Sequence, residues 1–489
     1  MVDVVASQPE PVVAPRRVGP GRVALRLVVA LVAGACVVLQ VRGWIALTTE
    51  VGCGARYGTC PHAAVPVVVV SLILALGTVP FAVGGLFRRP RWLAVLMVLV
   101  MVGGGLGAER GFDFSGGPAL SEIWSAGSGF DVPSAQGEWT TPDAVIRLNR
   151  GQIIAQDAAT GAVRWKYQIP EWNVVCTASR ATAGDVAMFG YGPSQGGPCV
   201  HWVALDLSTG RTLWTMTPAI QDQNSVRGPV SGFVTATRDV VAVVSDAGVA
   251  AFNARTGAKV WQTPSVPGCV DPLLDSGPDN VVAVFECRQS YVVADLDPDT
   301  GRQRWQTAVA WPACDCGLTL LSADPVVVGE RGANQKLRVF TAQGKQNVTI
   351  AANQVRIDKH SDGGNPIQPE SWTQVFGNTL VATTDEDEHV DLIGYDLTTG
   401  QRRWETPVSG HVSAVGRGGD AVLVLDASAP YPKLTTVNPA TGASTEVGAL
   451  TWWSGDKDYT SVYQFGSRYV VVNENAVIPS WSIFAFALT

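Results

Sequence analysis

The chain has 489 residues, of which only 16% are charged, and it contains 52 glycines, 30 prolines and 16 tryptophans. This length exceeds that of one ordinary domain, and the composition favours many short strands joined by turns over a helical fold. Residues 1–110 hold ten Lys and Arg against four Asp and Glu, and this balance of +6 leaves −13 of the total of −7 on residues 111–489. Such an acidic domain repels phosphate backbones, so no nucleic acid is expected as a partner.

The N-terminal part combines a polar tail with three apolar runs. Residues 1–22 have no hydrophobic period and are expected to form a disordered cytoplasmic tail. Residues 23–47, 65–87 and 92–108 are apolar over lengths close to the ~20 residues that a membrane-crossing helix needs. We therefore predict a three-helix transmembrane region over residues 23–108. Because a basic segment precedes the first run, a cleaved signal peptide is the alternative interpretation.

Arginines set the expected orientation of these helices. They gather before the first run and in the turn between the second and third runs, as Arg16, Arg17, Arg22, Arg26, Arg88, Arg89 and Arg91. Positive residues flanking membrane helices remain in the cytoplasm, so the loop 48–64 and everything after residue 108 are predicted to lie outside. The expected location is the cell membrane, with several passes, a cytoplasmic N-terminus and an extracytoplasmic C-terminal domain.

A phrase of the form Asp-x-x-Thr-Gly-x-x-x-Trp recurs along the rest of the chain. Its glycines stand 42 to 56 residues apart, at Gly161, Gly210, Gly257, Gly301, Gly344, Gly400 and Gly442. In the fifth copy Phe340 and Val348 stand four residues before and after the glycine. Asp or Asn starts a tight turn, Gly ends it with a positive φ, and a Trp at constant distance can be buried between neighbouring units. Periods of this length indicate a propeller or a solenoid.

A second apolar strand can be counted in each unit independently of the turn. These strands lie at residues 144–148, 186–189, 240–244, 281–285, 326–328, 379–382, 421–425 and 469–472. With the two strands that flank the turn, each unit has room for four. The last unit lacks a fourth strand, so we predict that residues 119–124, with Trp124, complete it and close the ring. The predicted fold is all-β, an eight-bladed β-propeller over residues 119–489 after three transmembrane α-helices; a seven-bladed ring is the competing count.

The phrase that runs from Ala204 through Asp206, Thr209 and Gly210 to Trp214 resembles the repeat of the pyrroloquinoline-quinone-like (PQQ-like) eight-bladed propellers. That superfamily includes quinoprotein dehydrogenases and cofactor-free scaffolds similar to the outer-membrane assembly factor BamB. The dehydrogenase branch implies an adjacent Cys-Cys pair, a calcium ion held by acidic and amide groups, and a catalytic Asp. This chain has no Cys-Cys dipeptide, so we predict no cofactor, metal or catalytic residue, with PQQ and calcium as the alternative.

The Thr-Gly turns mark one rim of such a ring, and the longer loops gather on the opposite rim, where partner contacts are expected. Aromatic residues in or beside those loops form the predicted partner-binding patch, namely Trp172, Trp311, Trp372, Trp452 and Trp453. Each of them could instead cap a blade. The charged run Asp385–His389 could hold calcium, but it lacks the spacing of a calcium-binding loop, and a solvated hairpin is the expected interpretation.

Eight of the nine cysteines fall in segments predicted to lie outside the cytoplasm, and Cys36 lies in the first helix. An even number of exported cysteines is typical of an oxidising compartment. From their places on the rim and in the outer loop, we predict the bridges Cys53–Cys60, Cys176–Cys199 and Cys269–Cys287. Cys314 and Cys316 are expected to form a strained, labile redox pair, or else an ordinary local disulfide or two thiols.

Together these features predict a membrane-anchored, extracytoplasmic scaffold that binds protein or envelope partners at the cytoplasmic membrane, without catalytic activity. The alternative is a PQQ-dependent quinoprotein dehydrogenase that feeds electrons to membrane quinone. A weaker third hypothesis is a sensor or redox protein that uses Cys314 and Cys316.

Overall fold

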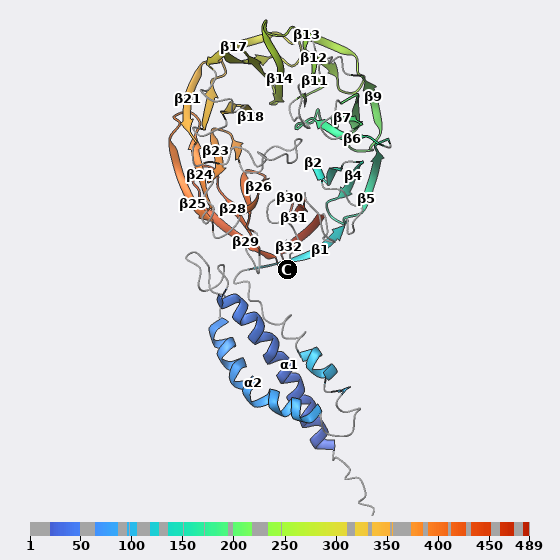
Figure 1. Cartoon of the computed structure of the whole chain (residues 1–489), viewed down its shortest axis with the longest axis vertical. Helices are drawn as coiled ribbons and strands as arrows, with labels where there is room; N and C mark the ends of the chain where they lie inside the picture. Colours follow the sequence, from blue (N-terminus) through green and yellow to red (C-terminus); the bar gives the residue numbers. More distant parts are fainter. Residues whose placement is uncertain are drawn as a thin grey trace, which may run out of the picture. The chain divides into compact units, whose positions relative to one another are not determined.

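The computed structural model describes residues 20–48, 64–86, 95–96, 98–104, 118–126, 135–149, 151–170, 172–193, 199–217, 233–245, 247–310, 318–330, 335–352, 355, 373–384, 390–408, 412–426, 432–450, 460–473 and 483–488. The chain forms two compact units, Met1–Gly116 and Gly117–Thr489. The described residues of the first unit are helical, and those of the second form strands and turns (Figure 1).

The N-terminal unit contains the helices α1 (Pro20–Thr48) and α2 (Ala64–Leu86), and residues 98–104 are also helical. Among the described residues one helical segment, Val23–Val41, is long and apolar enough to cross a membrane. The corresponding segment of α2, Val68–Pro80, is shorter. The sequence predicts three spans, and one candidate span is identified among the described residues.

The second unit is built from groups of four antiparallel strands that follow one another in sequence. The first three separate sheets are β2 (Ala135–Thr141), β3 (Ala144–Asn149), β4 (Gln152–Asp157) and β5 (Val163–Gln168); β6 (Val174–Ala178), β7 (Val186–Gly192), β8 (His201–Asp206) and β9 (Thr212–Met216); and β10 (Val234–Thr237), β11 (Val240–Ser245), β12 (Gly248–Asn253) and β13 (Lys259–Thr263). The next three are β14 (Cys269–Ser276), β15 (Val281–Cys287), β16 (Ser290–Leu296) and β17 (Gln303–Ala310); β18 (Leu318–Ala323), β19 (Val326–Glu330), β20 (Lys336–Phe340) and β21 (Gln346–Ala351); and β22 (Thr373–Phe376), β23 (Thr379–Thr383), β24 (Val390–Asp396) and β25 (Arg402–Val408).

The remaining strands join the two ends of this unit. They are β26 (Val412–Gly418), β27 (Ala421–Asp426), β28 (Lys433–Val437) and β29 (Ser444–Leu450), followed by β30 (Thr460–Phe465), β31 (Arg468–Asn473), β32 (Ile483–Leu488) and, from the start of the unit, β1 (Ala119–Ala126). The strand β1 pairs antiparallel with β32, so the prediction that residues 119–124 complete the last unit is confirmed. Parallel contacts of β1 with β29 and of β26 with β30 close these eight strands on themselves.

The sheets stand around a common centre with their first strands inward and their fourth strands outward (Figure 1). The second strands are buried, as β3 and β23 show over their whole length, whereas the outer strand β17 alternates between buried and exposed residues. Hydrophobic clusters fill the space between neighbouring sheets; one of them joins Trp139 and Ile146 of the first separate sheet to Phe189 of the next. This face-to-face burial is what holds adjacent sheets together.

The repeated phrase forms a turn that contacts a tryptophan of the preceding sheet. In the second sheet, Oδ1 of Asp206 accepts hydrogen bonds from the backbone N–H groups of Ser208 and Thr209 at 2.9 and 3.0 Å. Gly210 has φ of +70°, and a Cβ there would lie 2.5 Å from the ring of Trp165. The indole N–H of Trp165 donates to the carbonyl of Leu207 at 2.9 Å. Because the tryptophan comes from the preceding sheet, the phrase must recur once per sheet.

The fifth copy of the phrase is shorter by one residue. Phe340 pairs with Gln346, and the N–H of Thr341 donates to the carbonyl of Lys345 at 2.9 Å. In the intact fourth turn the corresponding pair is Leu296 with Gln303, and the N–H of Asp297 donates to Arg302. Thr341 therefore stands at the Asp position, and the alignment that placed Phe340 there by its distance from the glycine was wrong.

Candidate functional site

Trp172 is the predicted partner-binding residue that the structure describes. It lies between β5 and β6, its backbone has φ of +67°, and 89% of its side chain is exposed. A non-glycine residue with a left-handed backbone is uncommon, and such strain concentrates at functional sites. The other residues of the predicted patch, Trp311, Trp372, Trp452 and Trp453, lie outside the described residues.

Two disulfides lie on the same rim as Trp172. Cys176 of β6 is bonded to Cys199, and Cys269 of β14 is bonded to Cys287 of β15. These are the pairings expected from the sequence, and each joins segments that the blade topology brings together on the rim away from the Thr-Gly turns. The cysteines Cys53, Cys60, Cys314 and Cys316, and the run Asp385–His389, lie outside the described residues.

The second sheet also presents aromatic residues at this rim that the sequence prediction did not include. The rings of Tyr191 and His201, at the ends of β7 and β8, have centroids 5.1 Å apart, and Phe189 continues the series at 6.2 Å from Tyr191. His201 is exposed and Tyr191 is half-buried. The sequence contained a signal for these two residues, because they flank Cys199. Strand ends beside a disulfide-bonded cysteine lie on the same rim as that cysteine.

A cavity of about 740 Å³ lies among the first strands β2, β14, β18, β22, β26 and β30. Its lining includes the turns that lead from first to second strands, such as Pro142, Pro278 and Gly466. In an antiparallel meander these turns share a rim with the Thr-Gly turns. The central cavity is therefore on the opposite rim from Trp172, and the sequence analysis did not point to it.

Charged groups beside this cavity bind one another across the ring. The guanidinium of Arg180, which follows β6, donates to the carbonyl of Leu320 in β18 at 2.8 Å and lies 4.0 Å from Asp275 of β14. Burial raises the pKa of Asp275, and the nearby Arg180 opposes that shift. Arg417 of β26 stacks at 4.5 Å over the ring of Phe376. The contacts of Arg180 link sheets that are distant in sequence, whereas Arg417 and Phe376 link consecutive sheets.

The quinone and calcium of the dehydrogenase branch require a set of converging oxygen donors. The carboxylates that line the central cavity are Asp275 and Asp324. In the part of the chain that the structure describes, no group of three or more His, Cys, Asp or Glu residues could hold a metal ion.

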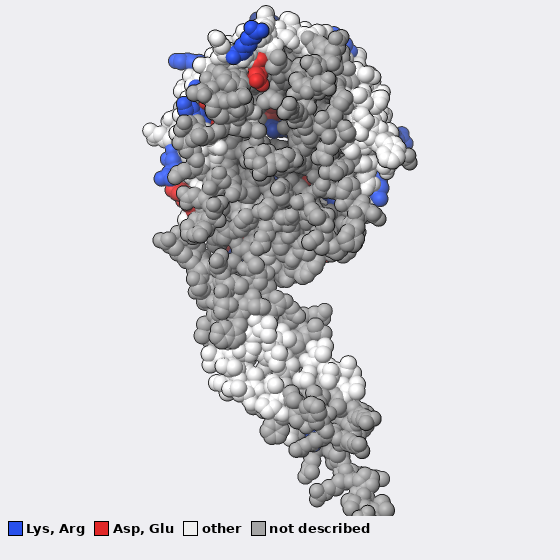
Figure 2. Space-filling model, viewed as in Figure 1, with Lys and Arg blue, Asp and Glu red and all other residues white. Residues whose placement is uncertain are grey.

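Charge on the propeller-like unit is dispersed. Figure 2 shows the described Lys and Arg side chains spread around the edge of this unit, with acidic side chains among them. Several are paired, as in Arg164 with Asp143 and Arg238 with Asp279. Nucleic-acid binding requires clustered positive charge, which the described part of this face does not present.

Comparisons with known proteins agree with the repeat. The family model described as outer membrane protein assembly factor BamB matches residues 149–406 and 292–480. BamB of Burkholderia pseudomallei (strain K96243) is 27% identical over 241 residues, which cover 46% of this chain and 57% of that protein. The matched region thus spans little more than half of the length of this curated relative.

Solved structures with a similar arrangement include BamB from Moraxella catarrhalis, with a TM-score of 0.46 and 15% identity over 76% of this chain and 100% of that chain. Sqt1 of Saccharomyces cerevisiae has a TM-score of 0.45 and 12% identity over 76% of this chain and 99% of that chain. Both TM-scores are below 0.5, and both identities are below 25%. The family match, by contrast, covers more than half of the sequence, and the chain belongs to the family described as outer membrane protein assembly factor BamB.

Proposed function

We propose that this protein is a membrane-anchored, extracytoplasmic scaffold, an eight-bladed β-propeller that binds envelope proteins without catalysing a reaction. The observation that carries the proposal is Trp172, an indole held by a left-handed backbone with 89% of its side chain exposed. Tryptophan is enriched among the residues that dominate protein interfaces, and a left-handed backbone at a non-glycine residue is a strained conformation that clusters at functional sites.

The count of eight blades is supported by the strand pairing. Six separate sheets of four strands are accompanied by two further groups of four, β26–β29 and β30–β32 with β1. Trp124 of β1 donates its indole N–H to the carbonyl of Ala158 at 3.2 Å, the same contact that the tryptophans of the repeats make. In this proposal the parallel contacts between the last two groups are contacts between neighbouring blades.

Three membrane crossings are supported by the helix packing within the N-terminal unit. Large apolar side chains such as Leu25, Val28 and Ile73 are mostly exposed, as they would be in lipid. A Cβ on Gly34 of α1 would lie 1.9 Å from the carbonyl oxygen of Met101, so the glycine permits a close approach of the kind that small residues allow in membranes. The amide of Gln40 donates to the Ser71 hydroxyl at 2.7 Å. In this proposal the arginines keep the N-terminus in the cytoplasm, so that the propeller lies outside.

The partners follow from the family and the location. The family description names an outer membrane protein assembly factor, and the bonds Cys176–Cys199 and Cys269–Cys287 suit an oxidising compartment. We therefore propose that the partners are envelope or membrane proteins that are assembled or held at the membrane, and that nucleic acid is not among them.

The experiment compares Trp172→Ala with the control Val260→Ala in the full-length protein. Val260 is an exposed apolar residue of the outer strand β13. After crosslinking in intact membranes, Trp172→Ala should lose at least one envelope protein that copurifies with the wild-type chain and with the control, while its melting temperature stays unchanged. Equal recovery of all partners from the three proteins would contradict the rim around Trp172 as the interface.

A further inference from the structure

One pair in the fourth sheet departs from the other five pairs that contain the tryptophan of a repeat. In antiparallel register, the tryptophan of each repeat lies directly opposite a residue of the third strand, and both side chains share one face of the sheet. The opposing residue is Ala or Gly in five cases, namely Ala155–Trp165, Ala204–Trp214, Ala251–Trp261, Gly394–Trp404 and Ala485–Trp124. In the fourth sheet it is Asp295, opposite Trp305. A carboxylate thus replaces a small apolar residue beside this one indole.

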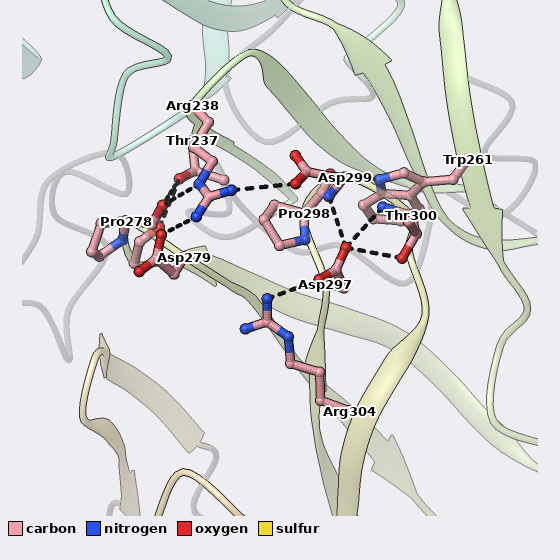
Figure 3. Close-up of polar contacts among 11 residues, drawn as sticks. Thr237, Arg238, Trp261, Pro278, Asp279, Asp297, Pro298, Asp299, Thr300 and Arg304 are labelled. Carbon is pink, nitrogen blue, oxygen red and sulfur yellow. Dashed lines mark hydrogen bonds and ion pairs between the residues drawn. The ribbon is translucent and has the colours of Figure 1, made fainter.

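The same indole lacks the hydrogen bond that the others make. The other five donate their N–H to the carbonyl that follows the Asp or Asn of the next turn: Trp124 to Ala158 at 3.2 Å, Trp165 to Leu207 at 2.9 Å, Trp214 to Ala254 at 2.7 Å, Trp261 to Pro298 at 2.8 Å and Trp404 to Pro439 at 2.8 Å. Figure 3 shows such an intact turn around Asp297, Pro298 and Trp261. Trp305 faces the turn that is one residue shorter, and its Nε1 has no partner.

Both residues are buried, and both are among the residues that line one cavity. Trp305 is 8% exposed and Asp295 is 4% exposed, and Oδ1 of Asp295 also has no hydrogen-bond partner. The cavity has a volume of about 450 Å³, within the range of small-molecule and peptide pockets. Asn280, Phe340 and Asn378 also line it.

Two other charged groups of this cavity are already paired, and the carboxylate of Asp324 also lines it. Arg304 binds Asp297 at 2.9 Å, and Asp279 binds Arg238, as Figure 3 shows. Burial raises the pKa of Asp295, and Asn280 and Arg304 oppose the shift. A buried carboxylate with a free oxygen is unfavourable for folding. Since five other sheets fold with Ala or Gly at this position, the fold does not require the carboxylate.

We propose that this cavity binds a segment of another polypeptide, whose backbone carbonyl accepts a hydrogen bond from Nε1 of Trp305 and whose N–H or basic side chain donates to Oδ1 of Asp295. The carbonyl is assigned because a peptide carbonyl occupies the equivalent position at the other five tryptophans. The donor is assigned because Asp295 offers an unsatisfied acceptor next to it. This site is on the Thr-Gly rim, so it is independent of the interface around Trp172 and goes beyond the scaffold function proposed for it.

The test measures binding of the blocked peptide acetyl-Gly-Lys-Gly-amide to the full-length protein in detergent by calorimetry. With 5-fluorotryptophan incorporated, the ¹⁹F resonance that is absent from Trp305→Phe identifies the indole. The peptide should shift that resonance saturably, and Asp295→Ala and Trp305→Phe should each weaken binding by about tenfold, the effect of losing one buried hydrogen bond. The control Trp261→Phe, whose N–H is satisfied within the chain, should leave the affinity unchanged.

Asp295→Ala also separates a binding role from a structural one. Because it introduces the residue that lies opposite the tryptophan in four other cases, it should fold and melt at the same or a higher temperature than the wild type. A lower melting temperature would show that the carboxylate supports the fold and would overturn the proposal. Absence of any saturable shift, or a shift with methyl glucoside and none with the peptide, would overturn it as well. A loss of partners in Trp172→Ala has no bearing on this outcome, so the two proposals fail separately.

Discussion

Replacing Asp396 tests how the repeated turn stabilises each sheet. Oδ1 of this residue accepts hydrogen bonds from the N–H groups of Thr398 and Thr399 at 2.7 and 3.2 Å, and Oδ2 accepts from Nε of Arg403 at 2.9 Å. Its hydrogen bonds to Thr398 and to the Arg403 guanidinium lower the pKa of Asp396 from 3.8 to about 2. Asp396→Asn keeps the acceptor for the turn and removes the charge, whereas Asp396→Ala removes both.

The expected magnitudes follow from these contacts. A pKa shift from 3.8 to about 2 corresponds to at most about 2.5 kcal/mol. The Arg403 side chain is 38% exposed, so solvent screening reduces the contribution to about 1 kcal/mol. Asp396→Asn should therefore cost about 1 kcal/mol at pH 7, since Asn fills the same position naturally at Asn253 and Asn438. Asp396→Ala should cost about 1–2 kcal/mol more, through the lost turn bonds.

The assay is denaturant unfolding of the full-length protein, followed by tryptophan fluorescence between pH 7 and pH 3. Because the folded pKa lies below the unfolded one, the charge contribution is fully present above the unfolded pKa of 3.8 and is lost as pH falls towards about 2. The difference between wild type and Asp396→Asn should shrink to about half at pH 3. If Asn were as damaging as Ala, or if the difference did not change with pH, this account of the turn would be refuted.

Three further outcomes are expected. Gly301→Ala should destabilise the protein by about 2–3 kcal/mol, because φ is +66° and the new Cβ would lie 2.4 Å from the Trp261 ring, whereas Gly151→Ala, with open space around it, should be neutral in the same unfolding assay. Cys176→Ser should cost about 3 kcal/mol by opening a bridge that joins residues 23 apart, and a melting temperature insensitive to reductant in the wild type would contradict this. Adding PQQ and calcium to the full-length protein should produce neither quinone-like absorbance nor dye-linked oxidation, and the appearance of both would make the dehydrogenase function the better one.

The regular part of the fold could be predicted because local chemistry repeats. The Asp, Gly and Trp positions of the phrase determine a turn and the two strands beside it, and each copy reports the same geometry. The role of Trp124 could be inferred for the same reason, since it supplies the indole that the last unit lacks. Membrane spans could be judged only from the length and composition of the apolar runs, and one of the three expected spans is identified as a candidate in the described residues.

The cavities could not be predicted, because they depend on contacts between sheets that are distant in sequence. Arg180 reaches Leu320 across the centre, and no pattern near either residue announces that contact. The indole N–H of Trp305 lacks its hydrogen bond where the next turn is one residue shorter than the others. Aligning the repeats on Gly344 does not reveal this shortening. A signal was present at Asp295, which stands six residues before its glycine where four other copies have Ala or Gly. Comparing the repeats position by position would have shown it.

Site-specific photocrosslinking tests the scaffold function most directly. Benzoyl-phenylalanine would be placed at Trp172 and, as the control, at Val260 in the full-length protein, with irradiation of intact cells. We expect position 172 to form a discrete crosslink to an envelope protein that position 260 does not form. Absence of any crosslink at position 172, or the same products from both positions, would contradict a partner-binding rim at Trp172.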